Sequence, residues 1–205
     1  MSGHLTAIPM LEQVPAGVFG PTPAAVDIRS YLVPHDSGLV LVDTGLDPSG
    51  HALDAALAAA GAGWSDVSDV VVTHGHRDHI GALAHVLESA PGAVVHASPL
   101  EGIADAAPLT GGETVGSLRA FATPGHTPGH LSLYDESRGV LLVGDCLGVM
   151  DGELVRAPAP FTADADQAEL SLHLLLELRG ARMFFSHGPE IDQPWEALDQ
   201  LLTAV

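Results

Sequence analysis

The sequence predicts an α/β sandwich in which mixed sheets are covered by helices. Three observations support this fold class: short apolar runs bounded by Gly or Pro, longer segments with apolar residues at spacings of three and four, and consecutive strand-like runs between residues 118 and 143. A doubly wound parallel sheet would require strict alternation of strands and helices. Because residues 118–143 lack this alternation, the sequence favours mixed sheets.

The elements follow in chain order. Apolar runs short enough for strands cover residues 39–42, 70–73, 93–96, 118–122, 131–134, 140–143 and 183–185. Helical spacing covers residues 51–60, 80–89, 166–178 and 195–202, with Asp164 or Asp166 as an N-cap candidate. Residues 148–162 contain Pro and Gly, so we expect a loop that lies over the site. Together these elements predict one domain over residues 1–205.

Composition narrows the class of protein. The 205-residue chain is 46% apolar and 16% charged, as in ordinary globular domains, and its formal net charge of −19 opposes binding to phosphate backbones. Residues 1–20 show no cationic start followed by an apolar run, and no segment approaches the ~20 apolar residues that cross a bilayer. We therefore expect a soluble, cytoplasmic protein that acts on a small molecule and binds neither nucleic acid nor membrane.

The densest group of candidate ligands follows the apolar run at residues 70–73. There, His74, His76, Asp78 and His79 form an H-x-H-x-D-H pattern. Since side chains alternate at the end of a strand, His74 and His76 can face one ion, while the following turn directs Asp78 and His79 toward a second. Cys146 is the only cysteine, so the site is built from imidazole and carboxylate, which suit zinc and also iron or manganese.

Three more candidates come just after strand-like runs: His126, Asp145 and His187. Catalytic groups are commonly carried by loops at one edge of a scaffold. A single histidine after a strand is weak support, but these three together with the 74–79 cluster indicate a two-metal site. The remaining histidines lack this context and are assigned to surface or packing roles: His4, His35, His51, His85, His96 and His173.

These motifs resemble those of the metallo-β-lactamase fold superfamily, nearest to its glyoxalase II-like hydrolase branch. The similarity runs from Val42-Asp43-Thr44-Gly45 through the metal motifs to His187-Gly188-Pro189. It implies a four-layer αβ/βα sandwich with two mixed sheets flanked by helices, and metals at one edge between the sheets. The ligands that the resemblance implies are His74, His76 and His126 for the first ion, Asp78, His79 and His187 for the second, and Asp145 as the bridge.

The expected activity is dinuclear metal-dependent hydrolysis of a small ester, thioester or lactone. Two zinc ions, with iron or manganese possible, would lower the pKa of a bridging water, and the metal-bridging hydroxide would attack the substrate carbonyl. Asp145 and Asp78 are the candidate catalytic residues, with Asp145 orienting the hydroxide and passing its proton to the leaving group. Five side chains in or beside residues 148–162 either form an apolar wall for the substrate or pack in the core: Leu147, Val149, Met150, Leu154 and Phe161.

Other features bear on the substrate. In the resembling family, true β-lactamases lack the bridging aspartate, so Asp145 argues against that activity. No basic residue occurs in the 18 residues after His187, which argues against a glutathione thioester, and no tyrosine closely follows Asp145 as in many quorum-quenching lactonases. The main alternative is a mononuclear iron persulfide dioxygenase of the same fold, which would use His74, His126 and Asp145. A non-catalytic metal-binding protein and a nuclease are weaker alternatives, the nuclease because of the acidic charge.

Three residues near the candidate ligands have two interpretations each. Asp43 can accept the free N–H of a ligand imidazole, or it can be a turn residue in Asp-Thr-Gly. For His130 a structural hydrogen bond is favoured over a catalytic role. Cys146 is interpreted as a small buried residue rather than a redox-sensitive group.

Overall fold

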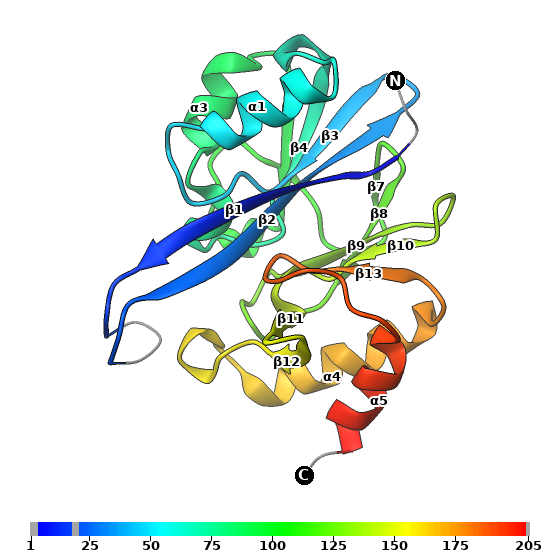
Figure 1. The fold of residues 1–205 in the computed structure, drawn as a ribbon. Coiled ribbons are helices and arrows are strands. Elements are labelled where there is room, and N and C mark those ends of the chain that lie inside the picture. Colours follow the sequence, from blue (N-terminus) through cyan, green and yellow to red (C-terminus); the bar gives the residue numbers. More distant parts are fainter. Residues whose placement is uncertain (1–3, 18–20, 204–205) are drawn as a thin grey trace.

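The computed structural model describes residues 4–17 and 21–203, and two sheets form its centre (Figure 1). The larger sheet has the strand order β1-β2-β3-β4-β5-β6. Its strands are β1 (Thr6–Val14), β2 (Ala24–His35), β3 (Gly38–Val42), β4 (Val67–Val71), β5 (Val94–Ala97) and β6 (Ala107–Pro108). The pairs β1/β2 and β2/β3 are antiparallel and the remaining pairs are parallel, so the sheet is mixed.

The second sheet has the order β13-β10-β9-β8-β7 and is also mixed. Its strands are β7 (Thr114–Val115), β8 (Leu118–Ala122), β9 (Leu131–Asp135), β10 (Val140–Leu142) and β13 (Arg182–Phe184). Only β10 and β13 run parallel within it, because β7 to β10 follow one another as antiparallel strands. This confirms the prediction that residues 118–143 contain consecutive strands.

Helices cover the outer faces of both sheets. The α-helices are α1 (His51–Ala59), α2 (Arg77–Ile80), α3 (Leu83–Ser89), α4 (Ala165–Leu175) and α5 (Pro194–Thr203). Short 3-10 turns are η1 (Trp64–Asp66), η2 (Pro99–Glu101), η3 (Gly144–Cys146), η4 (Ala159–Phe161) and η5 (Leu176–Leu178). Figure 1 shows α1 and α3 on one outer side of the sheets, and α4 and α5 on the other. No helix in the described residues is long and apolar enough to cross a membrane.

Three clusters of buried apolar residues lie between these layers. One joins α1 and α3 to the larger sheet, the second joins the two sheets, and the third joins the smaller sheet to α4 and α5. Strand β3 shows how the sequence builds them, since Leu41 belongs to the first cluster and its neighbours Val40 and Val42 to the second. Alternating side chains of one strand thus bury both sheet faces. The four-layer αβ/βα sandwich is confirmed.

The expectation of a loop at residues 148–162 is wrong for residues 148–156. Strands β11 (Leu147–Met150) and β12 (Glu153–Arg156) form a hairpin there. Its two-residue turn is Asp151-Gly152, and both residues have positive φ, 53° and 83°. An Asp-Gly pair between apolar residues is a typical signal for this tight turn, so the sequence carried the information.

Of the two interpretations of the five apolar side chains in this region, core packing holds for three. Leu147, Val149 and Leu154 are buried in the cluster beneath α4 and α5, where they stabilise the fold. Met150 and Phe161 are 57% and 36% exposed. Of the five, only Met150 and Phe161 therefore remain accessible to a ligand.

Two helical predictions need smaller corrections. The helix expected over residues 80–89 begins earlier and breaks into α2 and α3. At Gly81 the chain passes so close to the loop before α1 that a Cβ would lie 2.2 Å from the Leu46 carbonyl oxygen. For α4, the N-cap is Asp164, whose side chain accepts the Gln167 N–H at 2.9 Å, whereas Asp166 lies inside the first turn.

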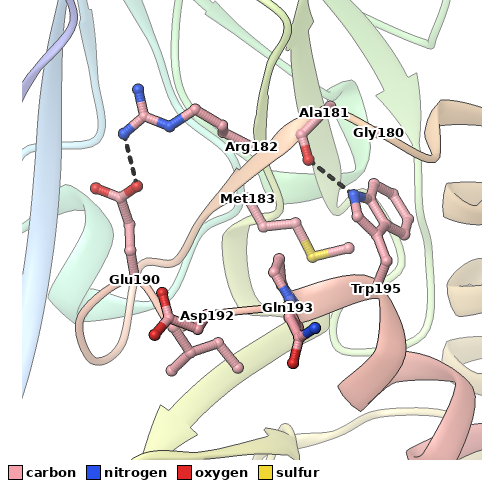
Figure 2. A pocket seen from close by; sticks show the side chains of 10 residues that line it. Gly180, Ala181, Arg182, Met183, Glu190, Asp192, Gln193 and Trp195 are labelled. Carbon is pink, nitrogen blue, oxygen red and sulfur yellow. Dashed lines mark hydrogen bonds and ion pairs between the residues drawn. The ribbon is translucent and has the colours of Figure 1, made fainter.

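Helix α5, predicted over residues 195–202, is anchored to the end of the smaller sheet. The indole N–H of Trp195 donates to the Ala181 carbonyl at 2.8 Å, and Arg182 pairs with Glu190 at 2.9 Å (Figure 2). These residues line a surface cavity of about 410 Å³. None of the seven predicted metal ligands lines it.

Candidate metal centre

The seven predicted ligands come from four segments that each follow a strand. His74 and His76 lie between β4 and α2, and Asp78 and His79 lie in α2 itself. The other three, His126, Asp145 and His187, follow β8, β10 and β13. These strand ends meet at one edge of the sandwich. The segment after β13 crosses to β2 of the larger sheet, where the Arg29 N–H donates to the Ser186 carbonyl at 2.8 Å, and this contact brings His187 to that edge.

The structure brings the ligand atoms of these residues into groups that can hold metal ions. The first group is His74, His76 and His126, whose ligand nitrogens lie within 4.8 Å of one another. In it, Nδ1 of His76 and Nε2 of His126 are 2.9 Å apart.

The second group is Asp78, His79 and His187, again within 4.8 Å. Nε2 of His187 lies 3.3 Å from Oδ2 of Asp78, and Nε2 of His79 lies 3.9 Å from the same oxygen. The two groups match the two ligand sets expected from the sequence.

Asp145 stands between the two groups. Its Oδ2 lies 3.3 Å from Nε2 of His126 in the first group and 3.3 Å from Nε2 of His187 in the second. Its Oδ1 lies 3.3 Å from Nε2 of His79, and Oδ2 lies 3.8 Å from Nε2 of His74. The carboxylate is therefore within reach of both groups at once.

The buried polar atoms of this centre fit divalent metal ions. Nε2 of His74, Nε2 of His79 and Oδ1 of Asp145 are buried without a hydrogen-bond partner among the described residues. Leaving such atoms unpaired costs about 1–3 kcal/mol each, so native proteins rarely do so without a ligand or water. Imidazole nitrogens and a carboxylate oxygen that converge on one space are the donors that zinc, iron and manganese accept.

The Asp-Thr-Gly motif holds His79. The carboxylate of Asp43 accepts the ring Nδ1–H of His79 at 2.8 Å, together with the N–H and hydroxyl of Thr73 at 2.8 and 2.7 Å. Thr44 donates its backbone N–H to the His79 carbonyl at 2.7 Å. Asp43 also has a φ of 57°, in the left-handed region that turn residues often adopt. The contact with the His79 ring, which the first interpretation expected, is present.

His130 supports the bridging carboxylate through the backbone. Its Nε2 accepts the Asp145 N–H at 2.9 Å, so the proton sits on Nδ1, which faces Thr123 Oγ1 at 2.9 Å. Burial lowers the pKa of His130 to about 3, which keeps the ring neutral and able to accept. The predicted structural hydrogen bond is thus present.

Charges in the metal-free centre divide the histidines into two classes. Burial lowers the pKa of His74 well below its ordinary value and that of His126 to about 4. Burial also lowers the pKa of His79 and His187, but the carboxylates beside them together outweigh it. Asp145 and Asp43 raise the pKa of His79 well above its ordinary value, and Asp145 and Asp78 raise that of His187 to about 10. Against its own burial, Asp145 has a lowered pKa because His79 and His187 lie beside it.

The remaining candidates lie outside these groups, as expected. His85 pairs with Asp54 at 3.2 Å and His96 with Asp69 at 2.8 Å, both away from the centre. Cys146 is buried, and burial raises the pKa of its thiol to about 11, so it is protonated at neutral pH. It serves as a small core residue.

Two supporting residues were not anticipated. Thr73 hydrogen-bonds Asp43 and lies 3.2 Å from Nδ1 of His74. Glu101 accepts hydrogen bonds from two loops that carry ligands. Thr73 directly precedes the H-x-H motif and could have been examined for that reason, but nothing in the local sequence distinguishes Glu101.

Comparison with known proteins agrees with this geometry. The model of the metallo-beta-lactamase superfamily matches residues 25–187. The uncharacterized protein YobT of Bacillus subtilis is 29% identical to this chain, and the match covers 88% of this chain and 91% of YobT. TTHA1623 in its di-iron-bound form is 28% identical, with a TM-score of 0.70 over 83% of this chain and 92% of its own.

An enzyme is also among the relatives. The hydroxyacylglutathione hydrolase of Dechloromonas aromatica is 36% identical over 70% of this chain, which spans 54% of that enzyme's length. The superfamily model alone covers more than half of the chain. The chain therefore belongs to the metallo-β-lactamase superfamily of metal-binding hydrolases.

Proposed function

We propose that this protein is a hydrolase that binds two divalent metal ions and cleaves a small ester, thioester or lactone. The observation that carries the proposal is the Asp145 carboxylate, placed 3.3 Å from histidine nitrogens of both ligand groups. In this proposal His74, His76 and His126 hold one ion, Asp78, His79 and His187 hold the other, and Asp145 contacts both. Two such ions would polarise a substrate carbonyl as Lewis acids and would lower the pKa of a bound water toward neutrality.

The side chains of the chain divide the remaining tasks. Asp145 is ionised at neutral pH because its pKa is lowered, so it can serve as a ligand and as a proton acceptor beside the scissile bond. Asp43 fixes the tautomer of His79, which leaves Nε2 directed at the centre. Asp78 lies at the accessible side of the centre.

Exposure indicates where a substrate enters. The side chains of His187 and Asp78 are 27% and 29% exposed, whereas those of His74 and Asp145 are 0% and 8% exposed. The centre is therefore closed on the His74 side and open on the His187 side. A small substrate approaching there would meet Asp78 and His187.

The proposed bond type and the proposed metal are supported by the chemistry of the candidate ligands and by the relatives. The hydroxyacylglutathione hydrolase among the relatives supports an acyl bond, and the net charge of −19 favours a small substrate over a nucleic acid. Imidazole and carboxylate donors suit zinc, which we propose as the native metal, while the di-iron relative makes iron the alternative.

Turnover of an ester, thioester and lactone panel tests the proposal. We expect metal-loaded protein to hydrolyse at least one class, and chelation to abolish the activity until metal is restored. Asp145→Asn should lower turnover by about 100-fold or more, because it weakens a shared ligand and a proton acceptor together. Near-normal rates in this variant would remove Asp145 from the mechanism.

His85→Ala provides the matched control. His85 is a partly buried histidine paired with a carboxylate, like the ligands, but its partner is Asp54 outside the centre. Metal content and turnover should stay at the wild-type level. Loss of metal in this control would contradict the ligand assignment.

A further inference from the structure

Glu101 links two loops of the metal centre without being a ligand candidate itself. It ends η2, which follows β5 and begins at a Ser98 cap whose hydroxyl accepts the Leu100 N–H at 3.3 Å. From there the carboxylate reaches the loop between β4 and α2 and the loop after β8. Its Oε2 accepts the Gly75 N–H at 2.6 Å, and its Oε1 accepts the Thr127 hydroxyl and the Gly129 N–H, each at 2.7 Å.

These contacts lie beside the histidines of the first ligand group. Gly75 separates His74 from His76, and Thr127 directly follows His126. One carboxylate therefore ties together the two backbone segments that supply all three histidines. Where the segments meet, the nitrogens of His76 and His126 are only 2.9 Å apart.

The glycines at both contacts make room for the carboxylate. A Cβ on Gly129 would lie 2.6 Å from Oε1 of Glu101 and 2.6 Å from Oγ of Ser98. A Cβ on Gly75 would lie 3.0 Å from the Glu101 carbonyl oxygen and 3.2 Å from Oε2. Contacts under 3.0 Å force neighbouring atoms to shift, so a side chain at Gly129 would displace the Glu101 carboxylate and the Ser98 hydroxyl from these positions.

The chemistry of the contacts requires a carboxylate. All three partners donate, and an ionised carboxylate only accepts, so every contact is a charge-assisted hydrogen bond. An amide in the same place would direct its NH2 group at a backbone N–H on one side. Glutamine keeps the size of the side chain but loses part of the link.

We propose that Glu101 is a positioning residue of the metal centre, which holds the two histidine loops at the separation that lets His74, His76 and His126 share one ion. The inference rests on the proposed function, since it assumes that this group binds metal. It adds a residue that contacts no ligand side chain and acts through the backbone.

Metal titration of Glu101→Gln tests the consequence. Residues that orient ligands typically change metal affinity by about 10- to 100-fold when replaced. We expect Co²⁺, added to metal-free protein in competition with a chelator, to bind the first group that much more weakly, while the second ion binds as in the wild type. The cobalt absorption spectrum should change for one ion only. Two ions bound with wild-type affinity and spectra would overturn the proposal.

Glu113→Gln is the matched control. Glu113 also accepts a threonine hydroxyl and backbone N–H groups, from Thr110 and Gly111, but in an exposed turn. Its replacement should leave both cobalt affinities unchanged. If Glu113→Gln lowered the cobalt affinity as much as Glu101→Gln, the loss would not depend on the position of Glu101 beside the histidine loops, and the proposal would be overturned.

Amide hydrogen exchange tests the link without any metal. In metal-free Glu101→Gln, the amides of Gly75 and Gly129 should exchange faster than in the wild type, while the Asp145 amide held by His130 stays protected. Unchanged exchange at both glycines would overturn the proposal even if metal binding weakened. A wild-type protein that binds no metal would instead contradict the proposed function, so the two failures are distinguishable.

Thr127→Val covers the case in which Glu101→Gln does not fold. This variant removes one of the three hydrogen bonds and keeps the shape of the side chain. We expect a smaller cobalt affinity loss and faster exchange at Gly129, with exchange at Gly75 less affected. Wild-type exchange and affinity in this variant would overturn the proposal.

Discussion

At the scale of single residues, the candidate ligands are held in place by hydrogen bonds from neighbouring side chains that are not ligands. Asp43 accepts three hydrogen bonds, from Thr73 and from the His79 ring, in a place that is 2% exposed. The candidate ligands could be singled out from the sequence because their types and spacing are chemically distinctive, and the structure brings them together. Thr73 and Glu101 could not be singled out, since ordinary threonines and glutamates acquire their role only from neighbours that the fold supplies.

Replacing Asp43 with Asn should weaken binding of the second ion. The amide can still accept from one donor, but it places an NH2 group among donors that all need an acceptor. We expect the affinity for one ion to fall by about 10- to 100-fold, with the first ion less affected. Isothermal titration with zinc measures both affinities, and two unchanged affinities would mean that Asp43 is only a turn residue.

The raised pKa values of His79 and His187 predict proton release on metal binding. In the metal-free protein both rings are protonated at neutral pH, since the pKa of His187 is about 10 and that of His79 is well above its ordinary value. A metal binds only the neutral ring, so binding must release protons and tighten as the pH rises toward the pKa of His187, about 10. Calorimetry in buffers of different ionisation enthalpy should detect the release near neutral pH. Binding that is independent of pH and buffer would contradict this charge assignment.

The raised pKa of His187 also determines how the stability of the protein without metal changes with pH. A histidine whose pKa is higher in the folded state than in the unfolded state stabilises the fold. This stabilisation is complete below the unfolded pKa of about 6.5 and disappears as the pH rises through the folded pKa. For His187 the loss falls between about pH 6.5 and 10. Chemical denaturation of chelated protein across this range should therefore show falling stability.

At the scale of elements, sequence patterns located most strands but failed where the signal was brief or interrupted. Strands β1 and β2 were not predicted, because Pro9 interrupts the apolar pattern of β1, and Asp27 and Arg29 interrupt that of β2. Pro9 is tolerated since β1 lies at the edge of its sheet. The break between α2 and α3 was also missed, because it depends on the Leu46 carbonyl, which is distant in sequence from Gly81.

The β11–β12 hairpin gives a test at this scale. Gly152 has a φ of 83°, and a Cβ attached to it would have no neighbour within 4 Å, so only backbone conformation opposes a larger residue there. Gly152→Ala should lower the free energy of unfolding by about 1–2 kcal/mol. Denaturant titration measures it.

Gly92→Ala is the control for the hairpin variant. It too has open space around its Cα, but its φ is not in the left-handed region. We expect its stability to be unchanged or slightly higher, because alanine reduces the freedom of the unfolded chain. Equal stability of the two variants would contradict the assigned turn.

At the scale of the whole molecule, the layers explain why distant segments form one centre. The sheets pack face to face through one apolar cluster, and the segments after β4, β8, β10 and β13 meet at the same edge. The fold class could be predicted because strand alternation and helical spacing are local. The ligand motifs indicated that four strand ends meet, but the pairings that bring them together, such as β10 with β13, could not be predicted.

Some whole-chain expectations stay predictions. A single domain over residues 1–205 includes residues 1–3, 18–20 and 204–205, which lie outside the described residues. A cytoplasmic location and a small-molecule substrate likewise stay predictions.

The metal content of anaerobically purified protein, measured by elemental mass spectrometry, tests the central claim most directly. Because Asp145 lies 3.3 Å from a histidine nitrogen of each of the two ligand groups, we predict about two zinc ions per chain. About one iron ion per chain would contradict the two-metal hydrolase and favour a mononuclear persulfide dioxygenase that uses His74, His126 and Asp145.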